Sequence, residues 1–80
     1  NQKAVMQQFE RAIEQVGETR FVDGAERQVI TAETAKTYAY MVLPKPEGKD
    51  NRWTNYSRAV TTLRDRGLVG FYNDYFWVNR

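Results

Sequence analysis

Residues 52–80, the C-terminal third of the chain, read RWTNYSRAVTTLRDRGLVGFYNDYFWVNR. Apolar side chains recur every three or four residues in the first half of this stretch, so they share one face of a helix. They are Trp53, Tyr56, Val60 and Leu63. Gly67 follows where a left-handed residue often ends a helix. Two strand-like runs then flank Asn73-Asp74, which tolerates the positive φ of a tight turn. The stretch predicts a helix over residues 52–66 followed by a β-hairpin.

The register of this hairpin follows if Asn73 and Asp74 are its two loop residues. The predicted cross-strand pairs are Tyr72–Tyr75, Phe71–Phe76, Gly70–Trp77 and Val69–Val78. One face then packs on the helices through Val69, Phe71, Phe76 and Val78. The other face is predicted to turn Tyr72, Tyr75 and Trp77 toward solvent, with Gly70 leaving room for the indole ring. An exposed aromatic cluster of this kind is typical of a protein–protein interface.

Upstream of this stretch, the pattern predicts a helix over residues 3–16 that ends at Gly17. The pair Phe21-Val22 fits either a small strand or a packed loop, and Asp23-Gly24 marks a turn. Residues 28–31 are predicted to form a short strand.

Thr31 is placed to cap a second helix over residues 32–41. Its inner positions are predicted to be Ala35, Tyr38, Ala39 and Val42. Two prolines then make residues 44–51 a loop, and Asp50 or Asn51 is placed to cap the last helix.

Composition bounds the chemistry that is available. Eighty residues allow one small domain, and we expect residues 1–80 to be that domain, excised from a larger protein. Cysteine and histidine are both absent, which removes thiolate metal sites and the commonest general base. No nucleophile–base pair, metal set, cofactor motif or small-molecule site is apparent, so we do not expect an enzyme. No apolar run is long enough for a membrane span, and a cytoplasmic protein (associated with the nucleoid, or nuclear if eukaryotic) is expected.

Charge is distributed unevenly along the chain. Residues 1–35 carry four basic and six acidic side chains, whereas residues 36–80 carry eight basic and four acidic ones. The half that contains the last helix is therefore positive, as contact with nucleic-acid phosphates requires. Fluctuation of surface charge in a small domain would give a similar distribution.

The predicted order is helix, strand, helix, loop, helix and hairpin, and residues 59–69 read AVTTLRDRGLV. Both features resemble the winged helix-turn-helix family, and the long 44–51 connection resembles that of archaeal replication initiators. The resemblance implies an α+β fold: a three-helix winged helix-turn-helix with a C-terminal two-stranded wing and a short strand before helix two. It also implies binding of double-stranded DNA by a transcription regulator or replication initiator. The tip Asn73-Asp74 departs from the family because it has no Arg or Lys.

Projection of the helix over 52–66 at 100° per residue turns a polar set away from the apolar stripe. The candidate DNA contacts in this set are Thr54, Asn55, Arg58, Thr61 and Thr62. Arg58 and Asn55 are the side-chain types that pair with guanine and adenine edges. Candidate phosphate contacts at the edge of the groove are Lys36, Lys45, Lys49 and Arg52. The alternative hypothesis is a winged helix that docks another protein, or a second copy, through Tyr72, Tyr75 and Trp77.

Overall fold

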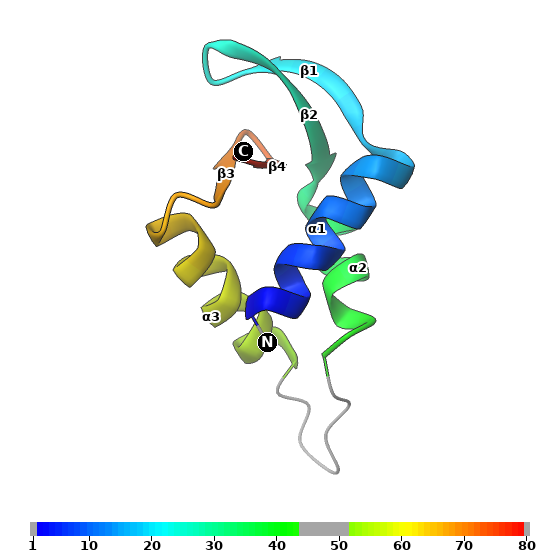
Figure 1. Cartoon of the computed structure of the whole chain (residues 1–80), viewed down its shortest axis with the longest axis vertical. Coiled ribbons are helices and arrows are strands. Elements are labelled where there is room, and N and C mark those ends of the chain that lie inside the picture. The colour runs from blue at the N-terminus through cyan, green and yellow to red at the C-terminus, as the bar shows by residue number, and fades with distance from the viewer. Residues whose placement is uncertain (1, 44–51, 80) are drawn as a thin grey trace.

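The computed structural model describes residues 2–43 and 52–79, and this part of the chain has an α+β fold of three helices and a four-stranded antiparallel sheet (Figure 1). The elements are α1 (Gln2–Val16), β1 (Glu18–Val22), β2 (Ala25–Thr31), α2 (Ala32–Tyr40), α3 (Arg52–Asp65), β3 (Val69–Tyr72) and β4 (Tyr75–Val78). The predicted 44–51 loop, its two prolines and the cap before α3 lie outside the described residues.

The strand order in the sheet is β1-β2-β4-β3. The end of β2 pairs with β4 through Ile30↔Phe76 and Thr31↔Tyr75. This pairing brings the strand that precedes α2 alongside the C-terminal hairpin. Thr31 then caps α2 as predicted, because its Oγ1 accepts a hydrogen bond from the backbone N–H of Thr34 at 3.2 Å.

The region before α2 differs from the sequence prediction. Residues 28–31 are only the end of a seven-residue strand, β2, that pairs with β1 from Glu18↔Val29 to Val22↔Ala25. The turn between the strands is Asp23-Gly24, and both residues have positive φ, 52° and 81°. These values suit a two-residue hairpin loop whose twist matches the strands. Phe21-Val22 is therefore part of a strand, and the β1–β2 hairpin arches away from the helices (Figure 1).

The C-terminal hairpin has the predicted register at all four pairs. Asn73 and Asp74 form its tight turn with φ values of 52° and 70°. The helix stop at Gly67 is also confirmed, since this residue has a φ of 73°. The N–H of Leu68 donates to the carbonyl of Leu63 at 2.9 Å, which is one of the hydrogen bonds of a Schellman ending.

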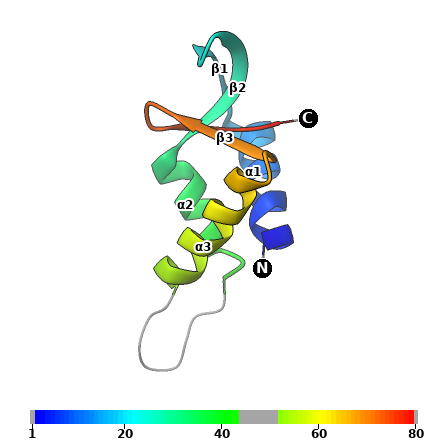
Figure 2. The same ribbon diagram turned by 90° about the vertical axis from the view of Figure 1, so that its left-hand side faces the viewer.

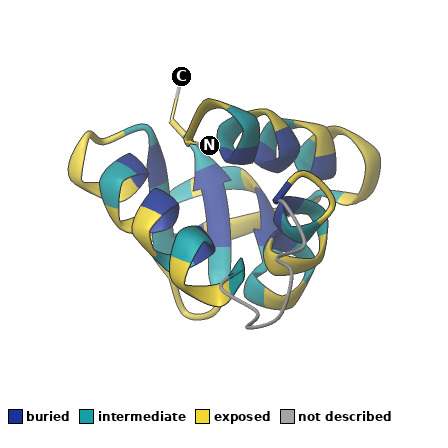
Figure 3. Ribbon diagram, turned by 90° about the horizontal axis from the view of Figure 1, so that it is seen from below, coloured by how far each residue is buried: buried dark blue, intermediate teal, exposed yellow. Residues whose placement is uncertain are grey.

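The main core lies where α1 crosses the other two helices and the sheet. The ring of Phe9 on α1 has its centroid 6.4 Å from that of Tyr56 and 5.2 Å from that of Phe76. The described helices turn their buried residues inward and their exposed residues outward (Figure 3). At the end of α2 the prediction was wrong about Val42, which is exposed. Leu43 is buried in its place, because the helix ends at Tyr40 and the chain turns.

The prediction that Trp77 faces solvent is wrong. The side chain is 5% exposed and forms a second cluster with Val22 and Val29. These two valines belong to β1 and β2, on the face of the sheet opposite the helices. Arg27 completes the cover, with its guanidinium carbon 4.7 Å from the centre of the indole ring. The missed β1–β2 hairpin is therefore the reason that Trp77 is buried.

Candidate nucleic-acid interface

The outer face of α3 is polar and open. Its buried side chains, Tyr56, Ala59, Val60 and Leu63, all lie toward the core. On the opposite side of the helix, Thr54, Arg58, Thr61 and Asp65 are exposed. This arrangement agrees with the helical projection for Thr54, Arg58 and Thr61. Asn55 and Thr62 lie farther round the helix, on the side toward α1, and are half-buried.

Tyr56 lies on the inner face of α3, and its hydroxyl is neutral. Burial, and to a smaller degree the neighbouring Tyr40, raise the pKa of its hydroxyl to about 12. Its ring packs edge-on against those of Phe9 and Tyr40. The helix is thus braced from below by aromatic contacts, and its outer side chains project from a fixed support.

Trp53 does not belong to the buried stripe, contrary to the sequence prediction. It is 59% exposed at the first turn of α3. The ammonium of Lys36 lies 5.2 Å from the centre of its ring and 5.4 Å from that of Tyr40. The predicted phosphate contact Lys36 is therefore beside the outer face of α3, at its N-terminal end.

Two further cations lie over aromatic rings along this side of the molecule. The guanidinium carbon of Arg52 is 5.0 Å from the centre of the Tyr40 ring, and that of Arg64 is 5.4 Å from the centre of the Phe71 ring. A cation–π contact of this kind helps to fix the position of a cation at the surface. Together with Arg58 and Lys36, they place four cations around the outer side of α3. Glu33 and Asp65 are exposed in the same region, so the described surface keeps a positive balance.

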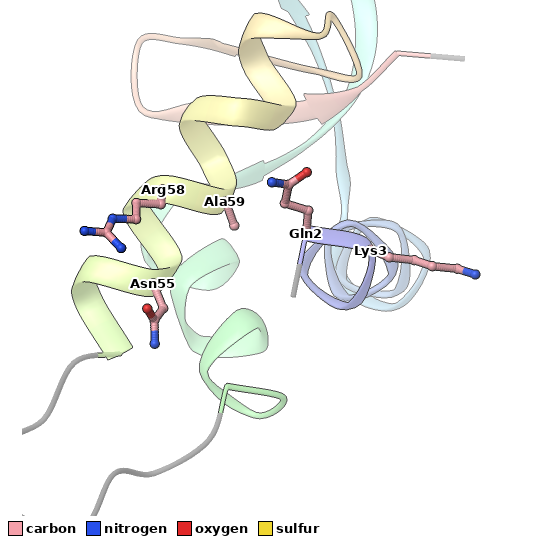
Figure 4. A pocket seen from close by; sticks show the side chains of 5 residues that line it. All are labelled: Gln2, Lys3, Asn55, Arg58 and Ala59. Carbon is pink, nitrogen blue, oxygen red and sulfur yellow. The ribbon is translucent and has the colours of Figure 1, made fainter.

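A hollow of about 410 Å³ separates α3 from the start of α1. Figure 4 shows that its polar groups do not converge, because the ammonium of Lys3 and the guanidinium of Arg58 point in opposite directions. Asn55 and Gln2 contribute amides to the walls. The hollow therefore does not concentrate charge on one point, and Arg58 is directed toward solvent.

A second cleft, of about 490 Å³, lies between α2, α3 and the C-terminal hairpin. Its floor is apolar and includes Val60, Phe71 and Phe76. Trp53 lies at the end of the cleft nearest the N-terminus of α3. Sequence reasoning missed this cleft. The available signal was the position of Trp53 at the margin of the apolar stripe, where a helical side chain often remains at the surface.

The tip of the C-terminal hairpin is joined to the start of α2. The carbonyl of Asp74 accepts a hydrogen bond from the N–H of Ala32 at 2.9 Å, which fixes the tip to the first residue of α2 (Figure 2). Tyr72 is 56% exposed, and Tyr75 is half-buried, with the Arg20 guanidinium carbon 5.9 Å from its ring centre. With Trp77 buried, the three aromatic residues do not form the common exposed face that was predicted as a protein interface.

Lys45 and Lys49, the other predicted phosphate contacts, lie outside the described residues. Within residues 2–43 and 52–79, no helix has the length and apolar character needed to cross a bilayer, and no acidic cluster suits a metal ion. No family model, curated protein or solved structure matches the chain.

Proposed function

We propose that the chain is a winged-helix domain that binds double-stranded DNA by placing α3 in the major groove. The observation that carries this proposal is the exposure of Arg58 at the centre of the outer face of α3, between Thr54 and Thr61. An α-helix fits the width of the major groove, and arginine is the side chain that most often contacts guanine there. The guanidinium of Arg58 is exposed and points away from the other side chains that line the hollow (Figure 4).

The arrangement of the elements supports the winged-helix part of the proposal. A strand, β2, lies between α1 and α2 in the chain and pairs with β4, which in turn pairs with β3. The sheet β2-β4-β3 thus packs against three helices, and β1 is an addition at its edge. In this arrangement α2 and α3 form the helix pair, and the C-terminal hairpin is the wing.

The wing has only a small role in the proposal. Its tip is short, carries Asp74 and is fixed to α2, so it offers no cation to a minor groove. We therefore assign the phosphate contacts to Lys36 on α2 and to Arg52 and Arg64 near the two ends of α3. Such contacts orient the domain on the duplex, whereas Arg58 and Asn55 read base edges.

The test is a titration of labelled blunt duplex DNA at several salt concentrations. We expect the logarithm of the binding constant to fall linearly with the logarithm of salt concentration, as release of counterions requires. Replacement Arg58→Ala should weaken binding by about 1–3 kcal/mol. The matched control is Arg11→Ala, which removes the same charge from an exposed position on α1. Absence of binding at low salt, or equal losses for the two variants, would overturn the proposal.

A further inference from the structure

The cleft beside Trp53 is lined by side chains that a blunt DNA duplex would not contact. Its floor is apolar and aromatic, whereas duplex DNA presents phosphates and base edges to a helix in its groove. Trp53, Ser57 and Thr61 line both this cleft and the outer face of α3. The cleft is therefore continuous with the outer face of α3, and a ligand bound to that face can extend into the cleft.

Cations stand at both ends of the cleft. Lys36 lies beside Trp53 at one end, and Arg64 lies over Phe71 at the other. Arg64 is eleven positions after Trp53 in α3, which corresponds to about 16 Å along the helix axis. Glu33 is the only carboxylate among the described residues that line the cleft.

An aromatic floor between two cations matches single-stranded nucleic acid. Unpaired bases stack on aromatic side chains, while the phosphates on either side of them contact lysine and arginine. Glu33 is compatible with the same ligand, because a carboxylate accepts a hydrogen bond from the amino group of cytosine. An acidic peptide would satisfy the cations but would not use the exposed side chain of Trp53 as a stacking platform.

We infer that this cleft holds a short single-stranded extension of the DNA whose duplex part lies on α3. This inference rests on the proposed function and makes it narrower: the preferred ligand is a junction between duplex and single strand. In such a complex Trp53 is the stacking platform, and Lys36 and Arg64 bind the flanking phosphates.

The test compares a blunt duplex with the same duplex carrying an unpaired extension of a few thymidines, at either the 5′ or the 3′ end. We expect wild-type protein to bind one of the extended duplexes about ten-fold more tightly than the blunt one. Replacement Trp53→Ala should reduce this ratio to about one, because it weakens binding of the extended duplex more than binding of the blunt duplex. Phe21→Ala is the matched control, because Phe21 is an aromatic residue 77% exposed on β1, away from the cleft.

Tryptophan fluorescence gives a second readout. Trp53 is 59% exposed and Trp77 only 5%, so quenching by an extended duplex reports on Trp53. The Trp53→Phe variant, which retains Trp77, should lose the quenching.

A wild-type ratio of one overturns the inference, as does an equal loss by Trp53→Ala on blunt and extended DNA. The second result would mean that the indole contacts the duplex itself. Failure of the proposed function is recognised separately, by an Arg58→Ala variant that binds blunt duplex as tightly as the Arg11→Ala control.

Discussion

The indole ring of Trp77 occupies the position that a β-carbon on Gly70 would take. The two residues are cross-strand partners in the C-terminal hairpin. A β-carbon built on Gly70 would overlap Cε2, Cζ2 and Nε1 of the indole ring. The ring is further held by a hydrogen bond of 3.1 Å from its Nε1 to Oδ1 of Asn79 and by Arg27 on its face. Glycine at position 70 is therefore a steric requirement of the buried tryptophan.

Replacement Gly70→Ala should destabilise the domain by about 2 kcal/mol, because the indole must move out of a packed cluster. Urea unfolding followed by circular dichroism measures the change. In a Trp77→Phe background the smaller ring should reduce the additional cost of the alanine, so the two changes should be non-additive. Additive losses would show that Gly70 is needed for backbone freedom and not for the ring.

The same pair shows how far sequence reasoning reaches in this fold. The register of the hairpin follows from two turn residues and alternating side chains, which are local signals. The burial of Trp77 depends instead on Val22 and Val29, from a hairpin about fifty residues earlier in the chain. The alternation of side chains along a strand predicts that Trp77 lies on the face of the sheet opposite the helices. It does not predict whether another element covers that face.

In the candidate site, too, some features follow from local sequence and others depend on tertiary packing. The outward positions of Arg58 and Thr54 follow from helical periodicity, because the core of α3 is a continuous stripe. The exposure of Trp53 does not follow from it, since exposure depends on which other elements pack against the first turn of α3. The cleft joins residues of α2, α3 and β3, and only the tertiary arrangement brings them together.

Tyr56 should make stability fall in alkaline solution. Burial raises its pKa to about 12, while in the unfolded chain its hydroxyl ionises near pH 10. Between these values the folded state binds more protons than the unfolded state, so its stability is full below about pH 10 and is lost as pH rises toward 12. Replacement Tyr56→Phe removes this contribution.

The expected result is that wild type loses about 2 kcal/mol more of its unfolding free energy than Tyr56→Phe between about pH 9 and pH 12. Urea unfolding at the two pH values provides the measurement. The two proteins differ only in the hydroxyl at position 56, so the difference between their losses reports on Tyr56. Parallel losses would contradict a protonated Tyr56 in the folded state.

Thr31 links the sheet to α2, because it pairs with Tyr75 and caps the helix that presents Lys36. Its Oγ1 accepts from the N–H of Thr34 and donates to the hydroxyl of that residue at 3.0 Å. Replacement Thr31→Ala should cost about 1 kcal/mol of stability. Thr31→Ser keeps the capping oxygen and should retain most of it. Equal losses, measured as unfolding midpoints, would assign the effect to strand packing.

The different roles proposed for Lys36 and Arg58 can be distinguished by measuring how the DNA-binding constant depends on salt concentration and on duplex sequence. Lys36 lies beside the outer face of α3 and is proposed to contact phosphate, so Lys36→Gln should lower the salt slope by about one for every blunt duplex sequence tested. Arg58 is proposed to read bases, so Arg58→Ala should also compress the affinity differences between duplex sequences. Arg11→Gln and Arg11→Ala, on α1, should change neither quantity. If Lys36→Gln altered sequence preference while Arg58→Ala changed only the slope, α3 would be oriented differently on the duplex, with the Lys36 side of the helix toward the bases.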